Sequence, residues 1–162
     1  MGMRVTRNDV PNMLEALKKK VEQVIIRNLQ YVGEHAINIA REQGSYTDQT
    51  GNLRSSIGYI IAKDGDIKES AGFDPSANSG TEGEEGAGDG ENFAIEQLDN
   101  YPKGYVLIIA AGMNYASYVE SSYNYSIIKT KHTVEKAAYD VITFTEVEAK
   151  QLAKRLFEGL KI

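Results

Sequence analysis

Imidazoles and thiols, the side chains that most often perform catalysis or bind metals, are scarce in this sequence. The two histidines, His35 and His132, stand far apart and outside any metal-binding spacing such as His-Glu-x-x-His. The absence of cysteine excludes disulfides, thiolate zinc sites and cysteine nucleophiles. We therefore expect surface histidines, no metal site and no cofactor.

Serines and carboxylates are the remaining groups that could catalyse a reaction. Ser55 and Ser56 follow the segment 51–54, which lacks the pattern of a nucleophile elbow and instead indicates a turn leading into a strand. None of the 23 Asp and Glu residues forms a pair that spacing sets apart from the others. A solvated acidic surface is the simpler interpretation, and the sequence predicts that the protein is not an enzyme.

The glycine-rich stretch Gly86-Ala87-Gly88-Asp89-Gly90 superficially resembles a phosphate-binding loop. No Lys-Ser or Lys-Thr pair follows it, and Glu84, Glu85 and Glu91 would repel a phosphate. It also lacks the full acidic ladder of a calcium loop. We therefore expect it to bind neither ligand.

Acidic residues are concentrated in one part of the chain. The net charge is -5, but residues 64–99 hold eleven of the 23 acidic residues and a single base, Lys68, so the remainder carries 17 basic against 12 acidic residues. Within this part, residues 74–92 are Gly, Ser, Asn and Glu with almost nothing to bury. We expect a flexible acidic insertion there, within a single domain spanning residues 1–162.

A long amphipathic helix is expected over residues 11–43. Its apolar residues recur mostly at spacings of three and four: Leu14, Leu17, Val21, Val24, Ile25, Val32, Ala36, Ile39 and Ala40. Its polar face carries Lys18, Lys19, Lys20, Arg27 and Arg41. A helix of this length spans roughly 45 Å, which is more than a small domain needs.

Three strands are expected next. Alternation indicates a strand from Leu53 to Ile61, with Leu53, Ile57, Tyr59 and Ile61 on one face and Arg54, Ser56 and Gly58 on the other. The Asp64-Gly65 pair predicts a hairpin, followed by a return strand over 67–73. The continuous apolar run 105–111 is typical of a central strand.

Helices are expected in the remaining segments. A short helix is predicted over 93–98 with Asn92 as its cap, and helical spacing continues from Tyr115 to Tyr123. Residues 124–143 favour a helix, but the residues from Asp140 to Phe144 fit a strand equally well. Thr145 and Glu148 match a capping box that opens a C-terminal amphipathic helix.

Together these elements predict an α+β domain. We expect a mostly antiparallel sheet packed by the long N-terminal helix and the C-terminal helix, with the helices on one side. No apolar run approaches the roughly 18 to 20 residues that span a bilayer, so we expect a soluble protein that does not enter a membrane.

Tyrosine is the unusual residue, with ten copies and no tryptophan. Tyr115, Tyr118, Tyr123 and Tyr125 lie close together in the sequence. Tyrosine is enriched where one end of a side chain is buried and the other is wet. Both a partly buried helix on the sheet and a contact between subunits would account for this cluster.

Two ordered motifs resemble the gene-product-ten-like tail-component family of tailed phages. One is Thr50-Gly51-Asn52-Leu53-Arg54-Ser55-Ser56-Ile57 after the long helix, and the other is Tyr115-Ala116-Ser117-Tyr118-Val119-Glu120 after a strand. The positions that carry the resemblance are Thr50, Gly51, Leu53, Arg54, Ser56, Ile57, Tyr115, Tyr118, Val119 and Glu120. In that family the first motif is a turn into the first strand, for which Gly51 would supply a positive φ angle.

The resemblance implies a virion structural subunit without enzymatic activity, acting as a head-tail connector, tail-completion or neck protein. Its expected partners are further copies of itself in a ring and neighbouring head, connector or tail proteins, with DNA passing through the channel without specific binding. The implied location is the virion, after synthesis in the bacterial cytoplasm. Arg54 could pair with Glu120 inside one subunit or with a carboxylate of the next.

This chain departs from the family in three places. It lacks the usual proline before Thr-Gly, it carries the acidic insertion 74–92, and residues 122–144 replace a short glycine-containing link. Such insertions usually form the surfaces that meet other proteins.

A nucleic-acid-binding accessory protein is the alternative. Its basic residues would be Lys18, Lys19, Lys20, Arg27, Lys129, Lys131, Lys136, Lys150, Lys154 and Arg155. The acidic pI of about 5.1 and the lack of a dense basic patch with stacking aromatics favour the structural subunit.

Overall fold

The computed structural model describes residues 10–42, 51–77, 82–112 and 143–159. They form the helices α1 (Val10–Glu42), α2 (Asn52–Ser55), α3 (Gly83–Gln97) and α5 (Thr143–Glu158), a 3-10 turn η1 (Leu98–Asn100), and the strands β1 (Ile57–Lys63), β2 (Asp66–Ala71) and β3 (Tyr105–Ala111). The predicted α+β class is confirmed, with a long N-terminal helix, an antiparallel sheet and a C-terminal helix.

The three strands form one antiparallel sheet in the order β2-β1-β3. The predicted hairpin turn is confirmed, because Asp64 and Gly65 both have positive φ angles, 53° and 85°. Asp64 also joins this turn to the one before β3, since its Oδ1 accepts a hydrogen bond of 2.9 Å from the Gly104 amide. The strand 105–111 forms as predicted but lies at the sheet edge, and β1 takes the central position.

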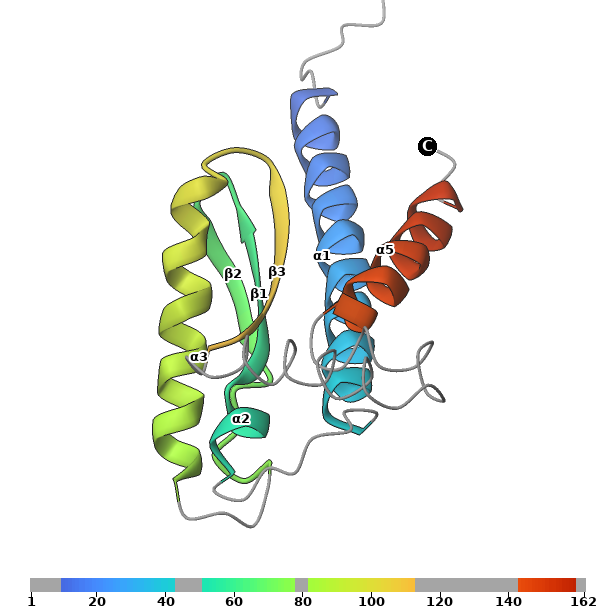
Figure 1. Ribbon diagram of the computed structural model, residues 1–162. Coiled ribbons are helices and arrows are strands. Elements are labelled where there is room, and N and C mark those ends of the chain that lie inside the picture. The colour runs from blue at the N-terminus through green and yellow to red at the C-terminus, as the bar shows by residue number, and fades with distance from the viewer. Residues whose placement is uncertain (1–9, 43–50, 78–81, 113–142, 160–162) are drawn as a thin grey trace, which may run out of the picture.

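Helices cover both faces of the sheet, so the expectation that all helices pack on one side was wrong (Figure 1). On one face Ile37 and Ala40 of α1 pack against a row of β1 side chains, Ile57, Tyr59 and Ile61, as the alternation predicted. On the other face α3 and η1 supply Ala94 and Leu98, which pack against Ile60, Ala62, Ile108 and Ala110. Helix α5 packs on α1, where Ala149 meets Val32 and Ala36.

The helix α3 corrects the prediction of a flexible acidic insertion over 74–92. The chain is helical from Gly83 onward, ten residues before the short helix expected at Phe93. Its buried face consists of small residues at helical spacing, Gly83, Gly86, Ala87, Gly90 and Ala94. Composition indicated disorder because these residues bury no large side chain, whereas the helix buries its backbone directly against other backbone.

Two boundaries also differ from expectation. Leu53 and Arg54 lie in the single turn α2 and not in a strand, since β1 begins only at Ile57. Helix α5 begins at Thr143, so Thr145 lies inside the first turn and the predicted capping box was wrong. The tyrosine-rich helix at 115–123 and the open assignment of residues 124–142 lie outside the described residues.

Candidate functional site

The described part of the first motif, from Gly51 to Ile57, is a buried junction. Gly51 has a φ angle of 87°, which confirms the positive value expected there. The chain then makes the α2 turn, in which Ser56 Oγ donates a 2.8 Å hydrogen bond to the Leu53 carbonyl. Leu53, Ser56 and Ile57 are all buried. These motif residues therefore fix the entry into β1 and do not form an exposed binding surface.

Arg41 fastens the end of α1 to this junction. Its Nε donates to the Arg54 carbonyl at 3.2 Å, and its Nη2 donates to the Ile57 carbonyl at 3.0 Å and to the Gly72 carbonyl. A guanidinium has several donors in a fixed planar arrangement, so one side chain can bind three carbonyls from two parts of the chain. The apolar spacing predicted Arg41 on the polar face of the helix, and nothing in that local pattern indicated these hydrogen bonds.

The glycines of α3 pack closely against the same junction from the other side. A Cβ atom at Gly86 would lie 2.3 Å from the Asn52 carbonyl oxygen, so only glycine allows this approach. Asn52 Nδ2 also donates a 3.1 Å hydrogen bond to Glu82 Oε2 just before α3. The junction is therefore enclosed between α3 and Arg41, which fixes the positions of both covering helices relative to β1.

The serine, histidine and carboxylate groups that could perform chemistry do not come together within the described residues. Ser55 is buried beside Gly83 and its hydroxyl has no hydrogen-bond partner among them, so no base activates it. His35 is exposed on α1, and His132 lies outside these residues. Within the same ranges no group of three His, Asp or Glu side chains could hold a metal ion. Thr50, Tyr115, Tyr118, Val119 and Glu120 fall outside the described ranges, so the Arg54–Glu120 pair remains a prediction.

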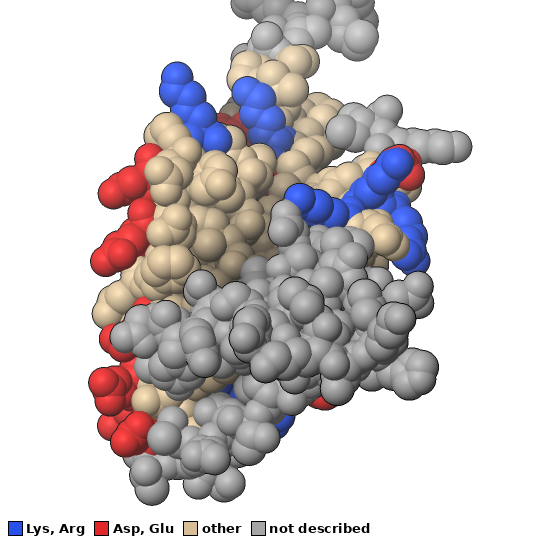
Figure 2. All heavy atoms as spheres, in the orientation of Figure 1, with Lys and Arg blue, Asp and Glu red and all other residues tan. Residues whose placement is uncertain are grey.

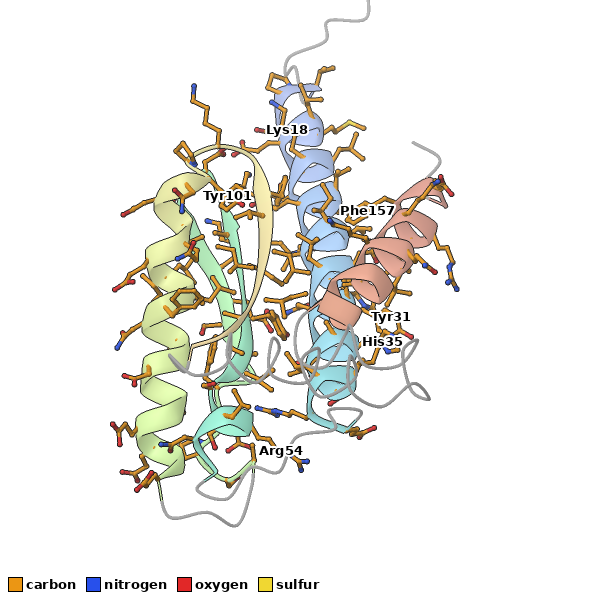
Figure 3. The ribbon with its side chains drawn as sticks, in the orientation of Figure 1. Lys18, Tyr31, His35, Arg54, Tyr101 and Phe157 are labelled. Carbon is orange, nitrogen blue, oxygen red and sulfur yellow. The ribbon has the colours of Figure 1, made fainter. Side chains whose placement is uncertain are left out.

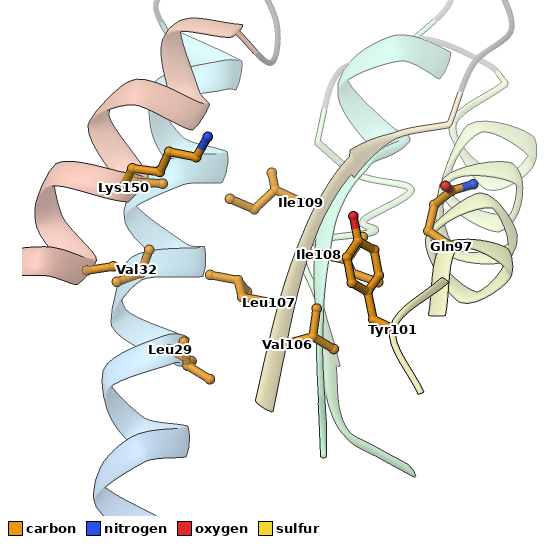
Figure 4. Close-up of a pocket in the computed structure, with 11 residues that line it drawn as sticks. Leu29, Val32, Gln97, Tyr101, Val106, Leu107, Ile108, Ile109 and Lys150 are labelled. Atoms are coloured by element: carbon orange, nitrogen blue, oxygen red, sulfur yellow. The ribbon is translucent and has the colours of Figure 1, made fainter. Parts of the chain in front are cut away.

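A cavity of about 540 Å³ runs around the edge strand β3 (Figure 4). It is lined mainly by apolar side chains from α1, β3 and α5: Leu29, Val32, Val106, Leu107, Ile108, Ile109, Ala149 and Ala153. The polar lining residues are Gln97, Tyr101 and Lys150. Among the described lining residues there is no carboxylate, histidine or serine, and the titratable groups are the phenol of Tyr101 and the amine of Lys150.

The N-terminal part of α1 extends past the end of the sheet with an exposed apolar stripe (Figure 1). Met13, Leu14, Leu17, Val21 and Val24 are between 41% and 64% exposed, and the first buried residue of the helix is Val32. Exposed apolar side chains that are contiguous on one face indicate an interaction surface. We call residues 10–24 the basic arm, because they include Lys18, Lys19 and Lys20.

Basic side chains flank this stripe on both sides. At about 100° per residue, Lys18 lies beside Leu14 on one side, and Lys20 lies beside Leu17 on the other. Figure 3 labels Lys18 near the N-terminal end of α1. All three lysines of the run 18–20 are exposed. Glu22 lies on the sheet side of the helix, where it forms a 3.0 Å ion pair with Lys63.

The outer side of α3 has the opposite charge. Its exposed acidic residues are Glu84, Glu85, Asp89 and Glu96, and we call this surface the acidic face. Helix α3 contains no Lys or Arg, and Figure 2 shows acidic side chains along this edge of the molecule, with basic ones at its upper end and over α5. Phe93 and Ile95 are also exposed on α3, at 43% and 40%.

Comparison of the chain with protein-family models, curated proteins and solved structures found no match. Among the described helices, none is both long and apolar enough to cross a membrane.

Proposed function

We propose that this chain is a structural subunit of a tailed-phage or prophage virion, acting as a head-tail connector or tail-completion protein by assembling into a ring. The observation that carries the proposal is the basic arm, because its apolar stripe finds no cover within the described fold. Apolar stripes of this kind are stabilised when another protein covers them. A subunit whose function is assembly needs such a surface, whereas an enzyme needs converging reactive groups.

The buried junction supports the same function in a second way. The motif positions Gly51, Leu53, Ser56 and Ile57, which resemble the tail-component family, contribute to the rigid frame between the two covering helices. In such a subunit, a rigid frame holds the outer surfaces at fixed angles, and repeated contacts at a fixed angle can close a ring. The motif thus serves assembly by positioning surfaces that lie elsewhere.

The proposed partners are further copies of the chain and the neighbouring head, connector or tail proteins of the virion. DNA would pass through the ring without specific binding. The subunit would be made in the bacterial cytoplasm and act in the virion.

The test is the mass of the purified protein over a wide range of concentrations, combined with negative-stain imaging. A closed ring with a central channel is the expected result. A protein that remains a monomer at the highest concentration, alone and with its neighbouring virion proteins, would contradict the function.

Nucleic-acid binding is the second candidate, and the exposed run from Lys18 to Lys20 favours it. Binding through phosphates would weaken steeply as salt increases. A titration of duplex DNA at two salt concentrations tests it. Salt-dependent affinity that is lost when these lysines are replaced would support this candidate over the structural subunit.

A further inference from the structure

We propose that the basic arm of one subunit docks on the acidic face of α3 in the next subunit. The inference rests on the proposed ring function and names the two surfaces that form the contact. Both surfaces belong to the same chain, so the partner is a second copy.

Charge complementarity is the first argument. Lys18 and Lys20 flank the apolar stripe, and Arg27 continues the side on which Lys20 lies. The acidic face of the next subunit presents four carboxylates, Glu84, Glu85, Asp89 and Glu96. No ion pair within the described residues neutralises them. Oppositely charged surfaces accelerate the encounter of subunits and fix their relative position.

The apolar content of both surfaces is the second argument. Leu14 borders Lys18 on one flank of the arm's stripe, and Phe93 borders Asp89 on one flank of α3, so an apolar pair can lie beside a charge pair where these flanks meet. The arm and α3 each have about four helical turns, so the two helices can pack along their whole length. Removing these side chains from water would contribute the non-polar part of the contact.

The positions of the two surfaces explain why the contact propagates. The arm belongs to the helix on one face of the sheet, and α3 covers the opposite face (Figure 1). A contact between different surfaces leaves one arm and one acidic face free at the two ends of any open chain of subunits. Such a head-to-tail contact closes into a ring when the angle between subunits permits. Pairing of two arms would instead stop at a dimer and would bring Lys18 and Lys20 of both copies together.

Charge reversal tests the contact. One variant carries Lys18→Glu with Lys20→Glu, and the other carries Glu85→Lys with Asp89→Lys. The matched control is Lys68→Glu with Arg155→Glu, which changes the net charge by the same amount as the first variant but alters exposed basic residues on β2 and α5, outside the arm and α3. Circular dichroism and thermal melting of each variant establish that it is folded.

Each reversed variant alone should weaken self-association by at least about tenfold, because like charges then face each other across the contact. The control should assemble like the wild-type protein. An equimolar mixture of the two reversed variants should recover assembly, since the acidic arm of the first variant faces the basic α3 of the second, and the remaining contacts keep their original signs.

Three results would overturn the docking. They are wild-type assembly of the Lys18/Lys20 variant, wild-type assembly of the Glu85/Asp89 variant, and no recovery in the mixture. If rings persist in these variants, the ring function stands and only the assignment of surfaces fails. If the wild-type protein forms no ring under any condition, the proposed function and this contact are both wrong.

Discussion

Gly90 of α3 lies directly against the backbone of Ser56 at the entry to β1. A Cβ atom at Gly90 would lie 2.2 Å from the Ser56 carbonyl oxygen and 2.7 Å from its Cα. These distances are too short for any side chain, and backbone cannot move aside as a flexible side chain can. This contact holds α3 at the distance from the sheet that lets Ala94 and Leu98 reach the core.

Replacing Gly90 with alanine should lower the free energy of unfolding by up to about 2 kcal/mol. Overpacking costs about 1–3 kcal/mol, and the roughly 1 kcal/mol that alanine gains over glycine in a helix offsets part of this cost. Urea denaturation measures the change. Gly88→Ala is the matched control, because a Cβ there meets nothing within 4 Å and should stabilise the protein by about 0.5–1 kcal/mol. Equal effects of both substitutions would contradict the close packing of α3.

Arg41→Lys should destabilise the protein although it preserves the charge. Lysine cannot reproduce the planar donors that reach the carbonyls of Arg54, Ile57 and Gly72. Leaving such carbonyls unsatisfied costs about 1–3 kcal/mol. Arg27→Lys alters an exposed arginine of the same helix and should change the free energy of unfolding by less than about 0.5 kcal/mol. Denaturation curves of the two variants compare their free energies of unfolding. Curves that coincide would show that the hydrogen bonds of Arg41 do not stabilise the junction.

Patterns that depend on neighbouring residues predicted much of the fold. The three-and-four spacing gave α1 to within one residue at each end, the Asp64-Gly65 pair gave the hairpin, and the apolar run gave β3. Each of these signals lies within the element that it predicts. The motif at Gly51 was found in the same way, including its positive φ angle.

Features that depend on distant residues could not be predicted. Helix α3 buries Gly86 and Gly90 against the backbone of Asn52 and Ser56, each 34 residues earlier in the chain, and glycine-rich composition alone indicates disorder. The spacing of Gly83, Gly86, Ala87, Gly90 and Ala94 was the signal that could have identified its buried face. The hydrogen bonds of Arg41 to the first motif could not be predicted either, because the carbonyls that it binds belong to Arg54, Ile57 and Gly72, at least 13 residues later in the chain.

The turn between β1 and β2 depends on the side chain of Asp64. This residue has a positive φ angle, and its carboxylate accepts a hydrogen bond from the Gly104 amide. Asp64→Ala removes the acceptor and leaves a strained alanine, so the free energy of unfolding should fall by about 1–3 kcal/mol. Asp64→Asn keeps an oxygen acceptor and tolerates the positive φ angle, so it should cost less than about 0.5 kcal/mol. Thermal melting compares the two, and an asparagine variant as unstable as the alanine variant would contradict this role.

Tyr59 gives the protein a stability that should decline in alkali. Its ring is buried against Gly33, and its hydroxyl donates a 3.0 Å hydrogen bond to Glu34 Oε1. Burial, followed by the hydrogen bond and the negative charge of Glu34, raises the pKa of Tyr59 well above its ordinary value of 10.0. Above about pH 10 the unfolded chain therefore loses this proton while the folded protein retains it, so the free energy of unfolding falls as the pH rises.

The decline should be visible as a difference between two variants in urea denaturation from pH 8 to pH 11. Tyr59→Phe loses the hydrogen bond and about 0.5–1.5 kcal/mol at pH 8, but it lacks the alkaline decline from this residue, which reaches at most about 1.4 kcal/mol per pH unit. Tyr101→Phe removes an exposed tyrosine and should decline as steeply as the wild-type protein. The wild-type and Tyr59→Phe curves should therefore converge above pH 10. The wild-type protein loses stability there because its unfolded chain releases the Tyr59 proton, whereas the phenylalanine variant has no proton to release at this position. Parallel curves would mean that Tyr59 ionises equally well in both states and that burial beneath α1 does not control its proton.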